Sequence, residues 1–155
     1  MPLVVGAAAA WMFVAGIRWG TFVAGGADAY GYVSQAELWR RGSLRIEQQF
    51  ARTFPWPHAQ WTFAPLGYRP AREPGYLVPG YAPGLPLLMA GAQMLAGHCA
   101  AYYVVPAAGA LAVIAAFVLA RALGGAPAGA AAAVLVAASP AFVVQVLWPM
   151  SDLPA

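Results

Sequence analysis

Two aspartates, Asp28 and Asp152, lie where apolar segments end, and their side chains suit group-transfer chemistry. Asp28 follows an apolar stretch that begins at the N-terminus, and Asp152 follows another near the opposite end of the chain. One carboxylate can accept the proton of an attacking hydroxyl. A second carboxylate, or the pair, can hold a divalent metal ion such as Mg²⁺ or Mn²⁺ against a phosphate leaving group. The two aspartates are distant in the sequence, so this chemistry requires a fold that brings them to one side.

The composition is that of a membrane protein. Of the 155 residues, 62% are hydrophobic and 8% are charged, whereas a soluble domain is about 25% charged. Arginine alone carries the positive charge, and the arginines form no basic stripe of the kind that nucleic acids require. We therefore expect a membrane as partner and no nucleic acid. The single cysteine, Cys99, cannot form an internal disulfide.

Residues 3–24 are apolar except for Arg18, and they are long enough to cross a bilayer as a helix. Arg18 lies near the end of this segment, where its side chain can extend to the interface. The alternative is a cleaved signal peptide. No basic region precedes the segment, and its apolar run is long for a signal, so we expect a membrane span.

Residues 28–42 have the pattern of a short helix along the membrane surface. Asp28 is a suitable N-cap, Glu37 and Arg41 form an i, i+4 pair, and Gly42 is a suitable stop. The apolar residues fall on one face at helical spacing; they are Ala29, Tyr32, Val33, Ala36 and Trp39.

Residues 43–82 read as a long polar and aromatic loop. Seven prolines between Pro55 and Pro83 argue against a long regular element here. Residues 84–97 are apolar but short and contain Pro86, so we expect an interfacial or re-entrant helix rather than a span.

Two further spans are expected at residues 101–120 and 128–147, both uncharged. The span at residues 3–24 then leads into an external loop over residues 25–100, and residues 148–155 begin a second external loop. Arg121 would lie in a tight cytoplasmic turn, as the positive-inside rule prefers.

The number of spans decides whether the aspartates can meet. With three spans, Asp28 and Asp152 face one compartment; if residues 84–97 also crossed, they would face opposite compartments. We predict an all-α membrane protein with three transmembrane helices, external juxtamembrane helices and a long external loop, forming the front part of a longer membrane protein.

Several short sequence motifs occur in the order seen in one family. Residues 28–36 (Asp-Ala-Tyr-Gly-Tyr-Val-Ser-Gln-Ala), with Gly42 after them, resemble the first external loop of bacterial polytopic glycosyltransferases of the GT-C fold. These are the family 39 relatives of protein O-mannosyltransferases and aminoarabinose transferases. Residues 81–88 (Tyr-Ala-Pro-Gly-Leu-Pro-Leu-Leu) resemble their Tyr-Pro-Pro-Gly segment. Residues 139–140 (Ser-Pro) and 151–155 (Ser-Asp-Leu-Pro-Ala) resemble their third span and second external loop.

The resemblance implies a hexosyl or pentosyl transferase that takes sugar from a polyprenyl-phosphate carrier. Asp28 would then be the catalytic base. Asp152 would help bind the donor phosphate or, with Asp28, a divalent metal ion. Tyr32, Tyr81 and Pro83 are expected to contact substrate.

The same resemblance implies a multi-pass protein of the bacterial inner membrane whose active face is external. A lipid, a glycan or a protein would accept the sugar. The 155 residues alone are expected to be inactive, because part of the donor site is missing. A non-catalytic polytopic membrane protein, such as a transporter or an assembly subunit, is the alternative; the scarcity of polar residues in residues 101–120 and 128–147 disfavours a transporter.

Overall fold

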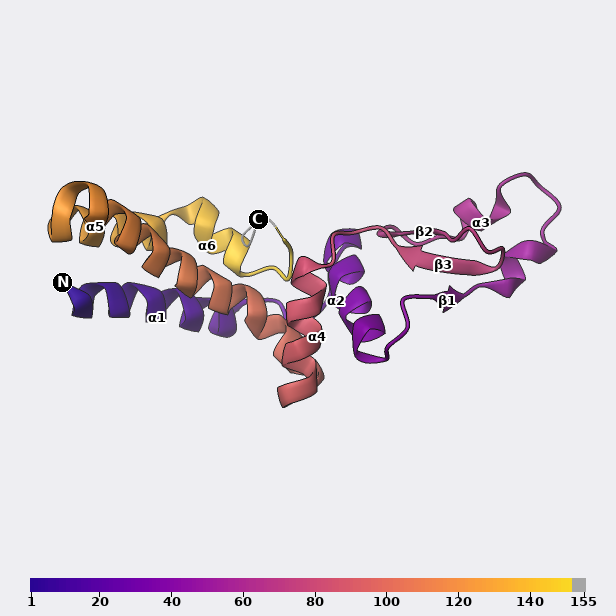
Figure 1. Cartoon of the computed structure of the whole chain (residues 1–155), viewed down its shortest axis with the longest axis horizontal. Coiled ribbons are helices and arrows are strands. Elements are labelled where there is room, and N and C mark those ends of the chain that lie inside the picture. The colour runs from indigo at the N-terminus through magenta and orange to yellow at the C-terminus, as the bar shows by residue number, and fades with distance from the viewer. Residues whose placement is uncertain (152–155) are drawn as a thin grey trace. The chain divides into compact units, whose positions relative to one another are not determined.

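The computed structural model describes residues 1–151, which form two compact units. Unit 1 comprises Met1–Phe22 and the chain from Tyr102 onward, and unit 2 comprises Val23–Ala101. Figure 1 labels the main elements. In chain order they are α1 (Pro2–Trp19), α2 (Ala27–Arg40), β1 (Ile46–Glu47), the 3₁₀ helix η1 (Gln49–Thr53), α3 (Ala59–Thr62), β2 (Tyr68–Pro70), β3 (Tyr76–Pro79), α4 (Gly84–Ala96), the 3₁₀ helix η2 (His98–Tyr103), α5 (Val104–Ala138) and α6 (Pro140–Val146).

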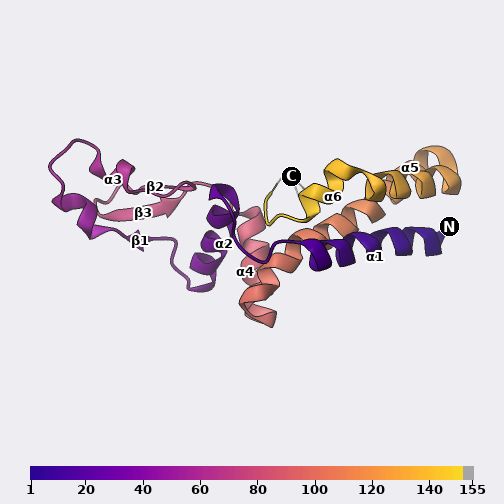
Figure 2. The same ribbon diagram turned by 180° about the vertical axis from the view of Figure 1, so that it is seen from behind.

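Unit 1 is a helical layer in which α1 packs along α5, as Figures 1 and 2 both show. Its core contains small and medium apolar side chains from three helices, including Met12 of α1, Val113 and Ala133 of α5, and Val146 of α6, all almost fully buried. Alanines at the contact allow the helices to approach closely, which favours dispersion contacts between them.

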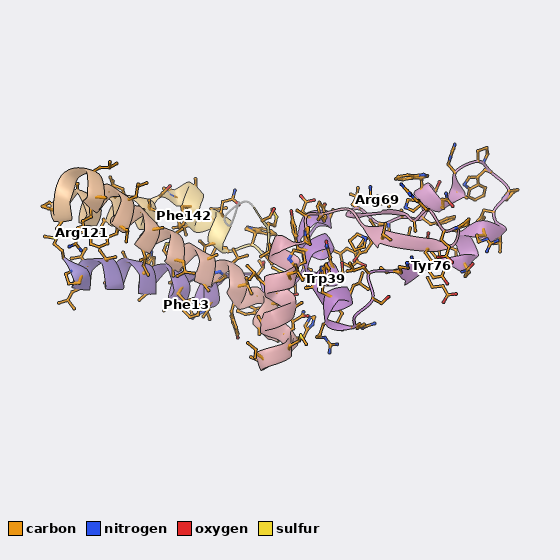
Figure 3. The ribbon with its side chains drawn as sticks, in the orientation of Figure 1. Phe13, Trp39, Arg69, Tyr76, Arg121 and Phe142 are labelled. Atoms are coloured by element: carbon orange, nitrogen blue, oxygen red, sulfur yellow. The ribbon has the colours of Figure 1, made fainter. Side chains whose placement is uncertain are left out.

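Helix α5 doubles back on itself at Gly125, and the turn is visible at the end of unit 1 in Figures 1 and 2. Gly125 has a φ of 79°, a conformation that side chains disfavour, and Pro127 starts the next stretch of helix. Arg121, labelled in Figure 3, lies near this turn with its guanidinium 5.8 Å from the Phe117 ring centroid. The reversal brings Ala133 into the same core as Val113.

The end of α1, the start of α5 and the end of α6 meet at one end of unit 1. A Cβ atom on Gly16 would lie 2.6 Å from Cγ of Pro106 and 2.8 Å from Cγ1 of Val146, so only glycine fits this contact. Beyond α1, the backbone N–H of Thr21 donates to the carbonyl of Leu147 at 3.0 Å. This hydrogen bond holds the segment after α1 beside the segment after α6.

The prediction of an all-α chain with three transmembrane helices is wrong. Among residues 1–151, two helical segments are, by length and composition, apolar enough to cross a membrane: Pro2–Trp19 and His98–Ala138, the second of which contains the turn at Gly125. The span expected at 128–147 is not one helix, because its first part belongs to α5 and the chain breaks before α6. At the break, Ser139 is extended (φ −67°, ψ 119°), as expected for a residue that precedes proline.

In unit 2, helix α2 packs against α4. The apolar face expected from helical spacing is the buried one, with Ala29, Val33 and Ala36 almost fully buried. The predicted stop is also confirmed: Gly42 has a φ of 72°, and its N–H donates to the carbonyl of Trp39 at 3.0 Å. Trp39 is labelled on α2 in Figure 3.

The predicted Glu37–Arg41 pair forms, with Nε of Arg41 3.0 Å from Oε1 of Glu37. Arg40, which the sequence argument did not include, makes the closer contact, because both its Nε and Nη2 donate to the same carboxylate. The hydrogen bond from Arg40 lowers the pKa of Glu37 to about 2. This carboxylate is therefore held by two arginines on the solvent side of α2.

The region predicted as a loop, residues 43–82, contains a three-stranded antiparallel sheet in the order β1-β3-β2. Ile46 pairs with Leu77, and Arg69 pairs with Val78. The strands are two to four residues long, and prolines end β2 and β3. The prolines do exclude a long element, but they permit short strands that end at a proline.

Candidate functional site

The main candidate site lies on α2, where Asp28 accepts a hydrogen bond from the hydroxyl of Tyr81. The helix begins after Gly26, whose φ of 86° turns the chain, so that Asp28 lies in the first turn. The expectation that Asp28 caps the helix is wrong: Gly26 is the N-cap, and no side chain bonds there. A negative charge in the first turn is still favourable to the helix dipole.

The ring of Tyr81 is stacked on the ring of Tyr32, with centroids 4.8 Å apart and an angle of 25° between the planes. Two glycines make room for it. A Cβ atom on Gly67 would lie 2.5 Å from Tyr81 Cε2, and a Cβ atom on Gly31 would lie closer still. The stack and the two glycines fix the direction in which the Tyr81 hydroxyl points.

The backbone around Tyr81 is also held. The N–H of Gly80 donates to the carbonyl of Gly67 at 2.8 Å, and Nε2 of the buried Gln35 lies 3.5 Å from the carbonyl of Tyr81. Asp28, Tyr32 and Gln35 are spaced at i, i+4 and i+7 on α2, so they lie on one helix face. One face of α2 therefore contacts the carbonyl, the ring and the hydroxyl of Tyr81.

The hydrogen bond to the Asp28 carboxylate, together with some burial, raises the pKa of Tyr81 to about 12. The phenol consequently stays neutral and donates to Asp28 throughout the physiological pH range. The bond uses Oδ1 of the carboxylate. An ionised carboxylate has two acceptor oxygens, so Oδ2 can still accept a proton or a hydrogen bond from a hydroxyl.

A second tyrosine supports the same part of α2 from strand β2. The hydroxyl of Tyr68 lies 2.7 Å from Oγ of Ser34, and the Tyr68 ring lies 6.4 Å from the ring of Tyr30 between centroids. Tyr68 is 7% exposed, and burial raises its pKa. This contact anchors the sheet to the helix that carries Asp28.

The structure brings together three of the five residues predicted from the sequence: Asp28, Tyr32 and Tyr81. Pro83 lies at the start of α4, where its carbonyl accepts the N–H of Leu87 at 2.9 Å, outside the ring contacts of the two tyrosines. Asp152, the other aspartate of the predicted pair, lies outside the described residues.

Four further residues of the site were not predicted from the sequence: Gly31, Ser34, Gln35 and Gly67. Gly31 and Gln35 follow Asp28 at i+3 and i+7, spacings that indicate a shared helix face. That signal was present in the sequence. Gly67 is different, because only its closeness to Tyr81 in space identifies it.

The described residues do not form a metal centre at Asp28. Within residues 1–151, no group of three or more His, Cys, Asp or Glu side chains converges. Oδ1 of Asp28 accepts a hydrogen bond from the neutral phenol of Tyr81. The other aspartate of the predicted metal pair, Asp152, lies outside the described residues, so the metal site stays a prediction.

The arrangement has the parts that a carbohydrate site uses. It offers a carboxylate acceptor, a neutral phenol donor and an aromatic stack beside them. No protein-family model, no curated protein sequence and no solved structure matches the chain.

Proposed function

We propose that this chain is part of a membrane glycosyltransferase in which Asp28 is the general base. The donor is a sugar linked to a polyprenyl phosphate, and the acceptor is a hydroxyl group of a lipid, a glycan or a protein. The chain resides in the bacterial inner membrane, and Asp28 faces the external side.

One observation carries the proposal: Tyr81 donates its hydrogen bond to Asp28. The two residues come from separate motifs, residues 28–36 and 81–88, whose order in the sequence resembles that of the GT-C family. A contact between the motifs is what a shared active site requires. The two helical segments that are long and apolar enough to cross a membrane are consistent with a lipid-linked donor.

In the proposed reaction, the oxygen of the acceptor hydroxyl attacks the anomeric carbon of the donor sugar. The bond from that carbon to the phosphate oxygen breaks, and the electron pair leaves with the polyprenyl phosphate. Asp28 takes the proton of the hydroxyl through Oδ2. Tyr81 keeps Oδ1 occupied and so orients the carboxylate. The stacked rings of Tyr32 and Tyr81 offer a surface for the sugar ring.

Asp152 takes a supporting part in this proposal, as a ligand of the donor phosphate through a bridging group or a metal ion. Its substitution by asparagine is expected to raise KM for the donor more than it lowers kcat, because it acts in binding. Asp28→Asn is expected to do the reverse.

The proposed function is tested by incubating membranes that contain the complete gene product with a radiolabelled polyprenyl-phosphate sugar and an extract of cell-envelope acceptors. We expect labelled sugar to move from the carrier to an acceptor, with release of polyprenyl phosphate. Membranes without the protein are the control. Equal consumption in both preparations would count against an enzyme and favour a non-catalytic membrane protein.

A further inference from the structure

A cavity of about 590 Å³ lies against the turn between β2 and β3 of unit 2, away from Asp28 in the sequence. Its size falls within the range of small-molecule sites, about 300–1,000 Å³. The charged and aromatic side chains that line it are Arg45, Trp61, Arg69, Arg72 and Glu73. We call this cavity the arginine groove. Arg69 is labelled in Figure 3.

The charges of the arginine groove do not balance. Nη1 of Arg45 lies 2.7 Å from Oε2 of Glu73, so these two side chains neutralise each other. Arg69 and Arg72 have no ion pair or hydrogen bond from their side chains to any residue in the described part of the chain. Two guanidinium groups therefore line one cavity without a counter-charge.

The backbone beneath these arginines is fixed. The N–H of Ala71 donates to the carbonyl of Tyr76 at 2.8 Å, which closes the turn that carries Arg72. The turn is held at Gly75 as well, because the N–H of Gln48, the residue after β1, donates to the carbonyl of Gly75 at 2.7 Å. Pro70 lies on the cavity wall and restricts the chain further. A fixed backbone lowers the entropy cost of binding a ligand.

The geometry points to an anion site: we propose that the arginine groove binds the phosphate group of an organic phosphate. Guanidinium groups bind phosphate through two parallel hydrogen bonds, which gives both affinity and orientation. Trp61, which is 55% exposed, offers an indole face to the organic part of the ligand. The phosphate can belong to a soluble sugar phosphate or to a phospholipid headgroup.

Binding is measured by isothermal titration calorimetry of the full chain in non-ionic detergent. The probes are glucose 1-phosphate, inorganic pyrophosphate and the soluble lipid dihexanoyl-phosphatidylglycerol, with glucose as the neutral control. The site variant is Arg69→Gln with Arg72→Gln. The matched control, Arg41→Gln with Arg52→Gln, removes the same charge from exposed positions outside the groove.

We expect the site variant to weaken phosphate binding at least about tenfold and the control to weaken it less than about twofold, because loss of a bidentate contact exceeds a general charge effect. Arg69→Lys with Arg72→Lys retains the positive charge and is expected to give an intermediate loss. A preference for glucose 1-phosphate would identify a soluble ligand, and a preference for the lipid would identify a headgroup; either supports the site.

Equal weakening in the site and control variants would overturn the proposal, as would the absence of saturable binding of every phosphate probe to the unmodified chain. The measurement contains no sugar donor on a polyprenyl carrier and no transfer step. Its failure would therefore leave the proposed function of Asp28 untouched.

Discussion

The hydroxyl of Tyr81 donates a hydrogen bond to the carboxylate of Asp28, 53 positions earlier in the chain. The carboxylate belongs to the first turn of α2, and the phenol belongs to the segment between β3 and α4. Stacking on Tyr32 and the absence of side chains at Gly31 and Gly67 hold the phenol in place. The predictions below test this relationship and the packing that supports unit 1.

The titration of Tyr81 tests the hydrogen bond directly. The pKa of the phenol is raised from 10.0 to about 12, so the neutral form is favoured in the folded chain. The stabilisation from this bond is complete below about pH 10 and is lost as the pH rises through about 12. Asp28→Asn removes the negative charge, and we expect the pKa to fall toward 10.

Ultraviolet difference spectroscopy of the phenolate, compared with Tyr81→Phe to assign the signal, measures this pKa. An identical Tyr81 titration in the unmodified chain and in Asp28→Asn would contradict the hydrogen bond.

Gly31→Ala tests the stack. The new Cβ atom would collide with the Tyr81 ring, and overpacking of this kind costs about 1–3 kcal/mol. Gly91→Ala is the matched control, because nothing lies within 4 Å of that position in α4 and alanine favours a helix by about 0.5–1 kcal/mol.

We expect Gly31→Ala to lower the free energy of unfolding and the Tyr81 pKa, and Gly91→Ala to leave the pKa unchanged. Denaturant unfolding and the phenolate titration report these two quantities. If Gly31→Ala kept the Tyr81 pKa near 12, the stack would not be what positions the hydroxyl.

Gly16→Ala tests the close contact in unit 1 between α1, α5 and α6. The added methyl group would lie within 2.8 Å of Pro106 and Val146, and we expect a loss of about 1–3 kcal/mol. Gly6→Ala, on the same helix with nothing within 4 Å, is expected to be neutral or slightly stabilising. Unfolding in mixed detergent micelles compares the two variants. Equal stability of both would show that the contact at Gly16 is not tight.

The parts of the fold that could be predicted from sequence are those set by local pattern. Helical spacing identified the buried face of α2, the Glu37–Arg41 pair and the stop at Gly42. Each depends on residues within one or two turns of each other, so a local reading suffices.

Contacts between distant residues could not be predicted in the same way. The strands β1 to β3 are too short to show an alternating pattern, and they pair across separations that the sequence does not encode locally. The span expected at 128–147 was wrong because Pro140, near its end, imposes a break at Ser139 that divides the uncharged segment. The contact between Asp28 and Tyr81 was not predicted. The family resemblance of their motifs assigned both residues to one substrate site, and the hydrogen bond between them comes from the fold.

The most direct test of the proposed function compares sugar transfer from a polyprenyl-phosphate donor by Asp28→Asn and by Glu37→Gln in membranes with the complete gene product. Both variants neutralise one carboxylate of α2, but Glu37 is bound by Arg40 and Arg41 and has no part in the proposed site. Loss of a general base lowers turnover by about 10²–10⁴-fold. The account predicts a loss of this size for Asp28→Asn and near-normal transfer for Glu37→Gln. Near-normal transfer by Asp28→Asn, with the protein inserted and folded, would contradict it.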